Sequence, residues 1–271
     1  MTGSTRREFL KDAGLGAAAV SVAGPQNKEM PGRPSQGAGG TAGPASIMAV
    51  AAHPGDAFFS MGAPVALQAH LGGQAVFLSL SLGEKGSATI PPAKYGEMQR
   101  AASENAATML GAHAEFLHYP DGEIPADDAA KFAVCDMIRK YKPDVIVTHW
   151  RGSWHKDHRA CYKIVDDAVF YAALPAITRA LPAHAVGRIY FNDNWEDAKG
   201  FKADTYLDIT TVFEAWRKAC AVFPMWRGEN GFRYDDYYGS LAVARGCVGG
   251  SKFAVALMSP AEQLTQRLQA L

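Results

Sequence analysis

Residues 46–56 read SIMAVAAHPGD, an apolar run that ends in a histidine, a proline, a glycine and an aspartate. The apolar run is typical of a strand that is buried on both faces, as strands of parallel sheets are. The polar end predicts a loop at the carboxyl end of that strand, where ligands gather in open α/β sheets. This stretch therefore predicts both the type of sheet and the position of a site.

The alternation of apolar runs with amphipathic segments continues along the chain and indicates βαβ units with right-handed crossovers. Further strands are predicted at 74–82, 114–119, 143–149, 188–191 and 205–209. Helices are predicted at 58–71, 95–110, 127–140, 159–174, 211–223 and 260–271. We therefore expect one α/β domain with a parallel sheet over residues 46–271.

The composition is that of an ordinary globular protein, with 48% hydrophobic and 20% charged residues among 271. Its 27 acidic and 27 basic residues give a formal net charge of zero, so we expect no electrostatic footprint for nucleic acid. The cysteines are far apart in the sequence and form no CxxC pair; they are Cys135, Cys161, Cys220 and Cys247. Disulfides are an option for an exported protein, but we favour small core residues.

Residues 1–23 resemble a twin-arginine export signal, because TRREFLK at 5–11 precedes a short apolar stretch with the small residues Ser21 and Ala23 at its end. The stretch is too short and too rich in Gly and Ala to span a bilayer stably. Residues 24–45 are rich in Gly, Pro, Ser and Ala, which predicts a flexible linker. We expect the protein to engage the twin-arginine translocation machinery and to work in the periplasm or outside the cell.

A second polar cluster, HKDH at 155–158, follows the strand predicted at 143–149. His155 and His158 share a face if they open the helix that follows. Together with His53 and Asp56 they offer two or three imidazoles and a carboxylate, which can hold a catalytic zinc ion and leave one position open. Either cluster alone could consist of solvated loop histidines. Because both follow strands of one predicted sheet, a shared site is favoured, and His149 is close enough to face it.

The two clusters resemble the motifs of the N-acetylglucosaminylphosphatidylinositol de-N-acetylase-like (LmbE-like) family of zinc-dependent deacetylases. The first family motif, AHPDDE, stands here as AHPGDA at 52–57, and the second, HxDH, as HKDH at 155–158. The similarity covers roughly residues 46–165 and includes Gly83-Glu84, Arg100 with Glu104, Leu110-Gly111, Tyr119–Gly122 and Pro143–Val145. The resemblance implies a three-layer Rossmann-like α/β fold with a mostly parallel sheet.

The resemblance also implies a Zn²⁺ ion held by His53, Asp56 and His158. Members of the family remove an acetyl group from an N-acetylated amino sugar or a related amide, and a carboxylate accepts the proton of the attacking water. By the same comparison, His155 would stabilise the tetrahedral oxyanion or protonate the departing amine, and Asp157 would orient a histidine.

Substrate contacts are expected from Arg100 and Asp121, at positions that match the family. Trp154 directly precedes the second cluster and is the best aromatic candidate for stacking on a sugar. Residues 233–238 (RYDDYY) either line the pocket or form a polar surface loop.

One position departs from the family: Gly55 stands where the general base, an aspartate, is usual. A replacement base could come from Glu84, Asp157 or His155, and the protein would then remain a hydrolase, which is the interpretation we favour. Alternatively, the chain is a zinc-retaining glycan-binding relative without turnover, or it uses zinc for another reaction. If the base is simply missing, Gly55→Asp is expected to raise hydrolysis greatly.

Overall fold

The computed structural model describes residues 44–260. The predicted export signal, nearly all of the predicted linker and, except for Pro260, the helix predicted at 260–271 lie outside the described residues. The strands are β1 (Ile47–Ala51), β2 (Ala75–Ser79), β3 (His113–Phe116), β4 (Val145–Thr148), β5 (Arg188–Asn192), β6 (Thr205–Asp208) and β7 (Ala254–Met258). The helices are α2 (Pro54–Phe59), α3 (Gly62–His70), α4 (Pro92–Met109), α5 (Asp128–Tyr141), α6 (Lys156–Ala173), α7 (Phe213–Cys220) and α8 (Tyr234–Gly249), with 3-10 turns η1 (Trp195–Asp197) and η2 (Pro224–Arg227).

Within the described range the strands form one sheet in the order β3-β2-β1-β4-β5-β7-β6. Strands β1 to β5 pair in parallel, and β7 runs antiparallel between β5 and β6. This mostly parallel sheet confirms the predicted fold class. Strand β1 pairs with β2 on one side and β4 on the other, so the strand order reverses there and opens a crevice at the carboxyl ends.

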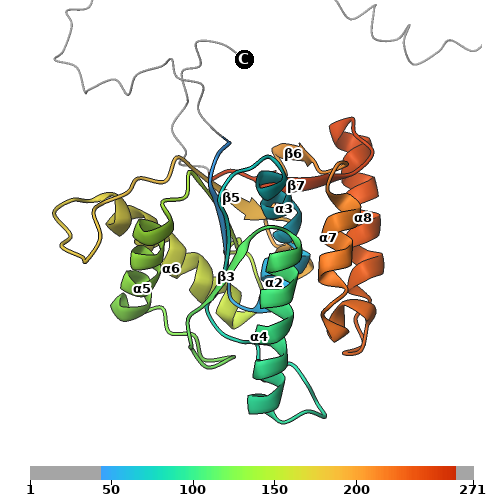
Figure 1. The fold of residues 1–271 in the computed structure, drawn as a ribbon, viewed down its shortest axis with the longest axis horizontal. Coiled ribbons are helices and arrows are strands. Elements are labelled where there is room, and N and C mark those ends of the chain that lie inside the picture. The colour runs from blue at the N-terminus through green and yellow to red at the C-terminus, as the bar shows by residue number, and fades with distance from the viewer. Residues whose placement is uncertain (1–43, 261–271) are drawn as a thin grey trace, which may run out of the picture. The chain divides into compact units, whose positions relative to one another are not determined.

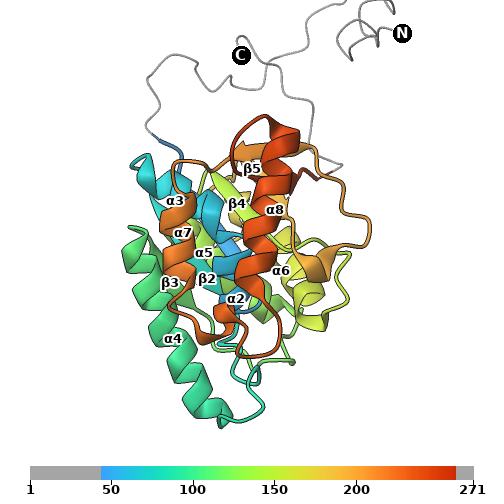
Figure 2. The same ribbon diagram turned by 90° about the vertical axis from the view of Figure 1, so that its right-hand side faces the viewer.

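Helices cover both faces of the sheet (Figure 1). Side chains alternate between the faces along β1, so Met48 and Val50 pack with α5 and α6, whereas Ala49 and Ala51 pack with the other helices. Helices α7 and α8 lie on that second face together with α2 and α3 (Figure 2). None of the described helices is both long enough and apolar enough to cross a membrane.

The helix predicted at 58–71 is in fact two helices, and the first begins earlier, at Pro54. Ser60 lies at the break, where its Oγ donates to the backbone oxygen of Asp56 (2.8 Å) and accepts from Asn192 Nδ2 (2.6 Å). Because α2 starts directly after β1, Asp56 lies in the first turn of a helix rather than in a loop.

Two C-terminal elements, α8 and β7, have no counterpart in the sequence prediction. Helix α8 contains three glycines, which lower helix propensity. Gly246 is required by packing, because a Cβ there would lie 2.6 Å from the backbone oxygen of Lys252. The four cysteines are free thiols; Cys135, Cys161 and Cys220 are buried, as the core interpretation predicts, and Cys247 is exposed.

Candidate metal centre

Both polar clusters lie at helix starts that follow neighbouring strands. His53 is the N-cap residue of α2, after β1, and Asp56 is in the first turn of that helix. His155 is the N-cap residue of α6, after β4, and His158 is in its first turn. Since β1 and β4 are parallel neighbours, their carboxyl ends bring the two clusters to one edge of the sheet.

The side chains of the predicted metal triad converge on one carboxylate oxygen. Asp56 Oδ2 lies 3.0 Å from His53 Nδ1 and 3.1 Å from His158 Nε2. Asn194 Nδ2 donates to the other oxygen, Asp56 Oδ1, at 3.0 Å, which fixes the carboxylate plane. Burial opposes ionisation of Asp56, but the two histidines hold its pKa well below the usual value.

His53 Nδ1 and Asp56 Oδ2 are hydrogen-bonded, whereas the contact between His158 and Asp56 fits a shared cation better than a hydrogen bond. His158 Nε2 is buried and, among the described residues, has no hydrogen-bond partner, although Asp56 Oδ2 is close. Two ligands of one tetrahedral zinc ion lie roughly 3.3 Å apart, which follows from zinc–ligand distances near ~2.0–2.1 Å. Among the described residues, the possible ligand groups are His53 with His155 and His158, Asp56 with His149 and His158, and His53 with Asp121 and Asp157, so the predicted triad is divided between groups. The donor set of imidazoles and a carboxylate therefore fits a metal ion.

One buried carboxylate, Asp197 of η1, orients two of the histidines. It accepts from His158 Nδ1 at 2.9 Å and from His149 Nδ1 at 2.8 Å. Burial would raise the pKa of Asp197, yet the two imidazoles lower it strongly. Burial likewise opposes the charge on His158, but Asp56 and Asp197 raise its pKa to about 9. Such carboxylate–histidine pairs fix the orientation of ligand rings in metal sites.

The other nitrogen of His53 faces a second pair of carboxylates. Its Nε2 lies 3.2 Å from Asp121 Oδ1 and 3.5 Å from Asp157 Oδ2. Asp157 is fully buried and accepts from the backbone N–H of Gly122 at 2.6 Å. His53 Nε2 makes no hydrogen bond within the described residues and lies nearer to Asp121 than to Asp157, so the orienting role of Asp157 stays a prediction.

The neutral ring of His155 carries its proton on Nε2 rather than on Nδ1. Its Nδ1 accepts a hydrogen bond from the backbone N–H of Asp157 at 3.2 Å, so the neutral ring holds the proton on Nε2. Burial, together with the charges of His158 and His53, lowers the pKa of His155 to about 4. At neutral pH this side chain is a hydrogen-bond donor without a charge.

Glu84, predicted as a possible base, is engaged in the structure. Its Oε1 accepts from the backbone N–H of Asp121 at 2.8 Å, and Glu84 is not among the residues that line the pocket at the histidines. Asp121 lines that pocket, and its role as a substrate contact stays a prediction. The position of Glu84 suits support of the Asp121 loop rather than proton transfer.

Arg100 and Trp154 lie outside the pocket lining as well. Arg100 Nη2 contacts His118 Nδ1 at 3.2 Å, and its guanidinium lies over the Phe116 ring. Trp154 is 63% exposed and packs edge-on against Trp195, which does line the pocket. Their proposed roles in substrate binding stay predictions.

Glu196 was not predicted from the sequence, and its carboxylate lies beside one of the predicted metal ligands. Its Oε2 lies 3.4 Å from His158 Nε2, and the residue lines the pocket. Burial and the negative charge of Asp56 raise the pKa of Glu196 to about 7. A signal was present in the sequence, because the acidic stretch NDNWED at 192–197 directly follows the strand predicted at 188–191.

The pocket in front of the histidines has a volume of about 190 Å³ and an aromatic and polar wall. Besides the residues already described, it is lined by Gly55, Phe59, Gly83, Gly86, Tyr95, Gln99, Met225, Asn230, Tyr234 and Tyr238. Tyr234 and Tyr238 belong to the stretch 233–238, so that part of α8 does line the pocket. No lysine or arginine of the described residues is in this lining.

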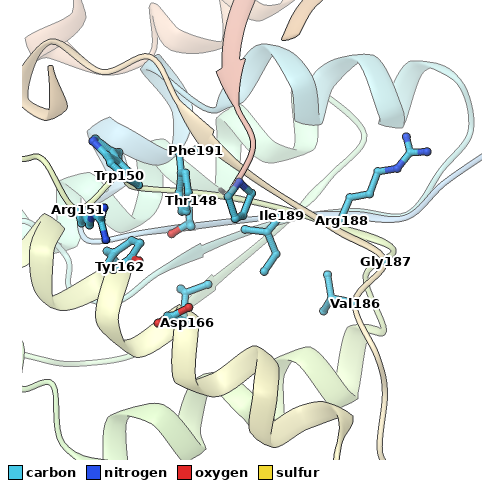
Figure 3. A pocket seen from close by; sticks show the side chains of 12 residues that line it. Thr148, Trp150, Arg151, Tyr162, Asp166, Val186, Gly187, Arg188, Ile189 and Phe191 are labelled. Atoms are coloured by element: carbon cyan, nitrogen blue, oxygen red, sulfur yellow. The ribbon is translucent and has the colours of Figure 1, made fainter. Parts of the chain in front are cut away.

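A larger cavity of about 570 Å³ lies elsewhere, beside β4, β5 and α6 (Figure 3). Tyr162 and Asp166 of α6 and Trp150 and Phe191 from the sheet side line it. It contains none of the possible metal-ligand groups found in the described range. Size alone therefore does not make it the reaction site.

Known proteins resemble this chain in both sequence and fold. Residues 48–169, which include both motifs, match the PIG-L family, described as GlcNAc-PI de-N-acetylase. The 4-oxalmesaconate hydratase of Pseudomonas putida KT2440 is 27% identical over 215 residues, covering 74% of this chain and 80% of that protein.

Two solved structures illustrate the fold similarity. The 4-carboxy-2-hydroxymuconate hydratase of P. putida KT2440 has a TM-score of 0.74 and 24% identity, covering 83% of this chain and 99% of that chain. The N,N'-diacetylchitobiose deacetylase of Pyrococcus horikoshii has a TM-score of 0.67 and 20% identity, covering 79% and 83%. The same fold thus occurs in a deacetylase and in a hydratase.

Proposed function

Because the chain belongs to the LmbE-like (PIG-L) family, we propose that it is a zinc-dependent hydrolase that removes an acetyl group from an N-acetylated amino sugar or a related amide. The observation that carries the proposal is the convergence of His53 and His158 on one oxygen of Asp56, with Glu196 beside them. His53, Asp56 and His158 would hold the zinc ion. When bound, zinc polarises a carbonyl group and lowers the pKa of bound water.

The side chains around the pocket supply the proton transfers. Glu196 accepts a proton from the attacking water while the water oxygen bonds to the amide carbon. The Nε2–H of His155 donates a hydrogen bond to the carbonyl oxygen as negative charge develops there. Glu196 then gives its proton to the departing nitrogen as the C–N bond breaks, which leaves acetate and a free amine.

The pocket wall supports an uncharged polar substrate. Tyr95, Trp195 and Tyr234 offer aromatic surfaces of the kind that packs against sugar rings, and Asn230 and Gln99 offer amide groups for hydroxyls. A substrate with several carboxylates would meet Asp56, Asp121 and Glu196 with no lysine or arginine among the described lining residues. Electrostatic repulsion would weaken its binding.

A second candidate is hydration of a carbon–carbon double bond next to a carboxylate. Two observations favour it. The chain is 27% identical to a hydratase, and Gly55 replaces the aspartate that serves as the base in amide hydrolysis, which suits a different reaction. In that reaction the hydroxyl of water bonds to one alkene carbon and a proton to the other. A third alternative, zinc and sugar binding without turnover, remains an outcome of the test.

The deciding experiment uses purified protein with one equivalent of zinc and two substrate sets. Acetate release is measured from N-acetylglucosamine and its β-1,4 dimer, and loss of ultraviolet absorbance is measured with unsaturated dicarboxylic acids. We expect acetate release that a chelator abolishes. Hydration without acetate release would support the second candidate, and zinc binding with neither reaction would support the binding protein.

The Glu196→Gln variant tests the assignment of the base. We expect it to lose activity by roughly 10²–10⁴-fold while it retains zinc. Glu214→Gln, at an exposed position of α7, is the matched control and is expected to match the unchanged protein. Equal activity in the two variants would rule out Glu196 as the base.

We also propose that the protein meets its substrate outside the cytoplasm. The support is the TRREFLK stretch at 5–11 with the apolar segment that follows it. Cell fractionation of the full chain, compared with an Arg6→Lys/Arg7→Lys variant, is expected to show export only of the unchanged chain. Equal distribution of both would contradict the proposal.

A further inference from the structure

The space beside Gly55 is not empty, although the residue has no side chain. Gly55 is buried in the first turn of α2. A Cβ at this position would lie 3.4 Å from Phe59 Cε2 and 3.5 Å from Met225 Sδ. A methyl group would therefore make ordinary contacts, but a longer side chain would have to share its space with the thioether of Met225.

Met225 comes from η2, far along the chain from α2, and two side chains of α4 hold its sulfur. Gln99 Nε2 donates to Met225 Sδ at 3.6 Å, and Tyr95 Oη donates to it at 3.9 Å. Both Gln99 and Tyr95 are buried. The thioether is thus a positioned part of the pocket wall, since the packing of α4 limits its movement.

We propose that Met225 occupies the side-chain space of the missing base, so that Gly55 and Met225 form a compensating pair. An aspartate at position 55 would bring a carboxylate against a thioether and a phenyl ring. Burial of a charge in such apolar surroundings is unfavourable unless donors pair with it. The side chain that fills this part of the pocket therefore comes from η2 instead of α2, and it is apolar.

With the apolar Met225 beside Gly55, this wall of the pocket offers, within the described residues, no carboxylate that could accept a proton. If the proposed hydrolysis is correct, proton transfer has to come from another side, where Glu196 lies, and Met225 contacts the substrate next to the reacting group. Met225 is then a specificity-determining residue that favours an apolar group at this point. The spatial pairing itself does not depend on the reaction and can be tested in protein without metal.

The test is a double-mutant cycle of Gly55→Asp and Met225→Ala, measured as Tm in the presence of chelator. Gly55→Asp alone is expected to lower Tm by roughly 5 °C, because an unpaired carboxylate is buried. Met225→Ala removes the thioether and frees the donors of Gln99 and Tyr95. We expect the double variant to lose clearly less than the sum of the two single losses.

Two controls separate this coupling from general damage. Gly55→Ala is expected to keep the Tm of the unchanged protein, since its methyl group fits. Met48→Ala removes a methionine that packs on the opposite face of the sheet, so its effect should add to that of Gly55→Asp. Additive losses for Gly55→Asp with Met225→Ala would overturn the proposal.

Acetate release by the zinc-loaded variants gives a second, separate result. With Met225 present, Gly55→Asp is expected to hydrolyse no faster than the unchanged protein. The double variant is expected to hydrolyse at least about tenfold faster than Met225→Ala alone. A large gain from Gly55→Asp alone would contradict the proposal. If no variant releases acetate, the proposed function fails, but the Tm cycle still decides whether the two residues share one space.

Discussion

At the scale of single residues, the site depends on how histidine rings are oriented. Asp197 contacts Nδ1 of both His149 and His158, so one carboxylate determines which nitrogen of His158 faces Asp56. Glu196, the neighbouring acid, instead faces the pocket. Two adjacent acids of η1 thus have different tasks because a 3-10 turn points their side chains in different directions.

Asp197→Asn is expected to weaken zinc binding by roughly 10–100-fold, because the amide cannot accept from both imidazoles as a carboxylate does. Competition with a chromogenic chelator measures the affinity, and circular dichroism checks that the variant is folded. Asp208→Asn, at an exposed strand end, is the matched control. Unchanged affinity in folded Asp197→Asn would contradict the orienting role.

The sequence was sufficient to predict that His53, Asp56 and His158 lie close together, because motifs that follow neighbouring parallel strands lie at the same edge of the sheet. It was not sufficient for Glu196 and Met225. Their positions depend on the 3-10 turns η1 and η2, whose short polar and aromatic sequences carry no periodic signal. Glu84 was a reasonable candidate by motif, but its contact with the Asp121 backbone is a matter of loop geometry.

At the scale of elements, one buried arginine joins α5 to the end of α6. The Arg139 guanidinium donates five hydrogen bonds, to the backbone oxygens of Tyr171, Ala172, Leu174, Ile177 and Leu181. The side chain is 2% exposed. Helical spacing places Arg139 four residues after the buried Cys135, but an arginine is rarely buried, so its residue type gave no reason to expect this contact. The contact exists because the chain at and after the end of α6 supplies the carbonyl oxygens.

Arg139→Lys is expected to destabilise the fold, because one ammonium group cannot reach all five carbonyl oxygens and leaves several buried without a donor. Loss of several such bonds costs about 3 kcal/mol, which corresponds to a fall in Tm of roughly 6–12 °C. Thermal unfolding followed by circular dichroism measures the change. Lys140→Met, at the neighbouring exposed position, is the control and should cost less than about 1 kcal/mol.

At the scale of the whole molecule, the fold explains why distant motifs form one site. The crevice between β1 and β4 collects residues from α2, α6 and η1, and η2 and α8 complete its wall. Periodicity predicted the parallel half of this arrangement. The antiparallel strand β7 and the glycine-containing helix α8 were missed because their stability comes from packing against β5, β6 and η2 rather than from local propensity.

Because the proposed ligands come from α2 and α6, zinc binding should stabilise the domain as a unit. A ligand at about 100 times its Kd adds about 2.7 kcal/mol, which corresponds to a rise in Tm of roughly 5–10 °C for a domain of this size. Differential scanning calorimetry of chelator-treated protein, with and without added Zn²⁺, measures this shift. Mg²⁺ should give no comparable rise, since it prefers an octahedral site of oxygen ligands. His158→Ala should lose the zinc-dependent rise because it removes one ligand, whereas an equal rise in His158→Ala would place the zinc elsewhere.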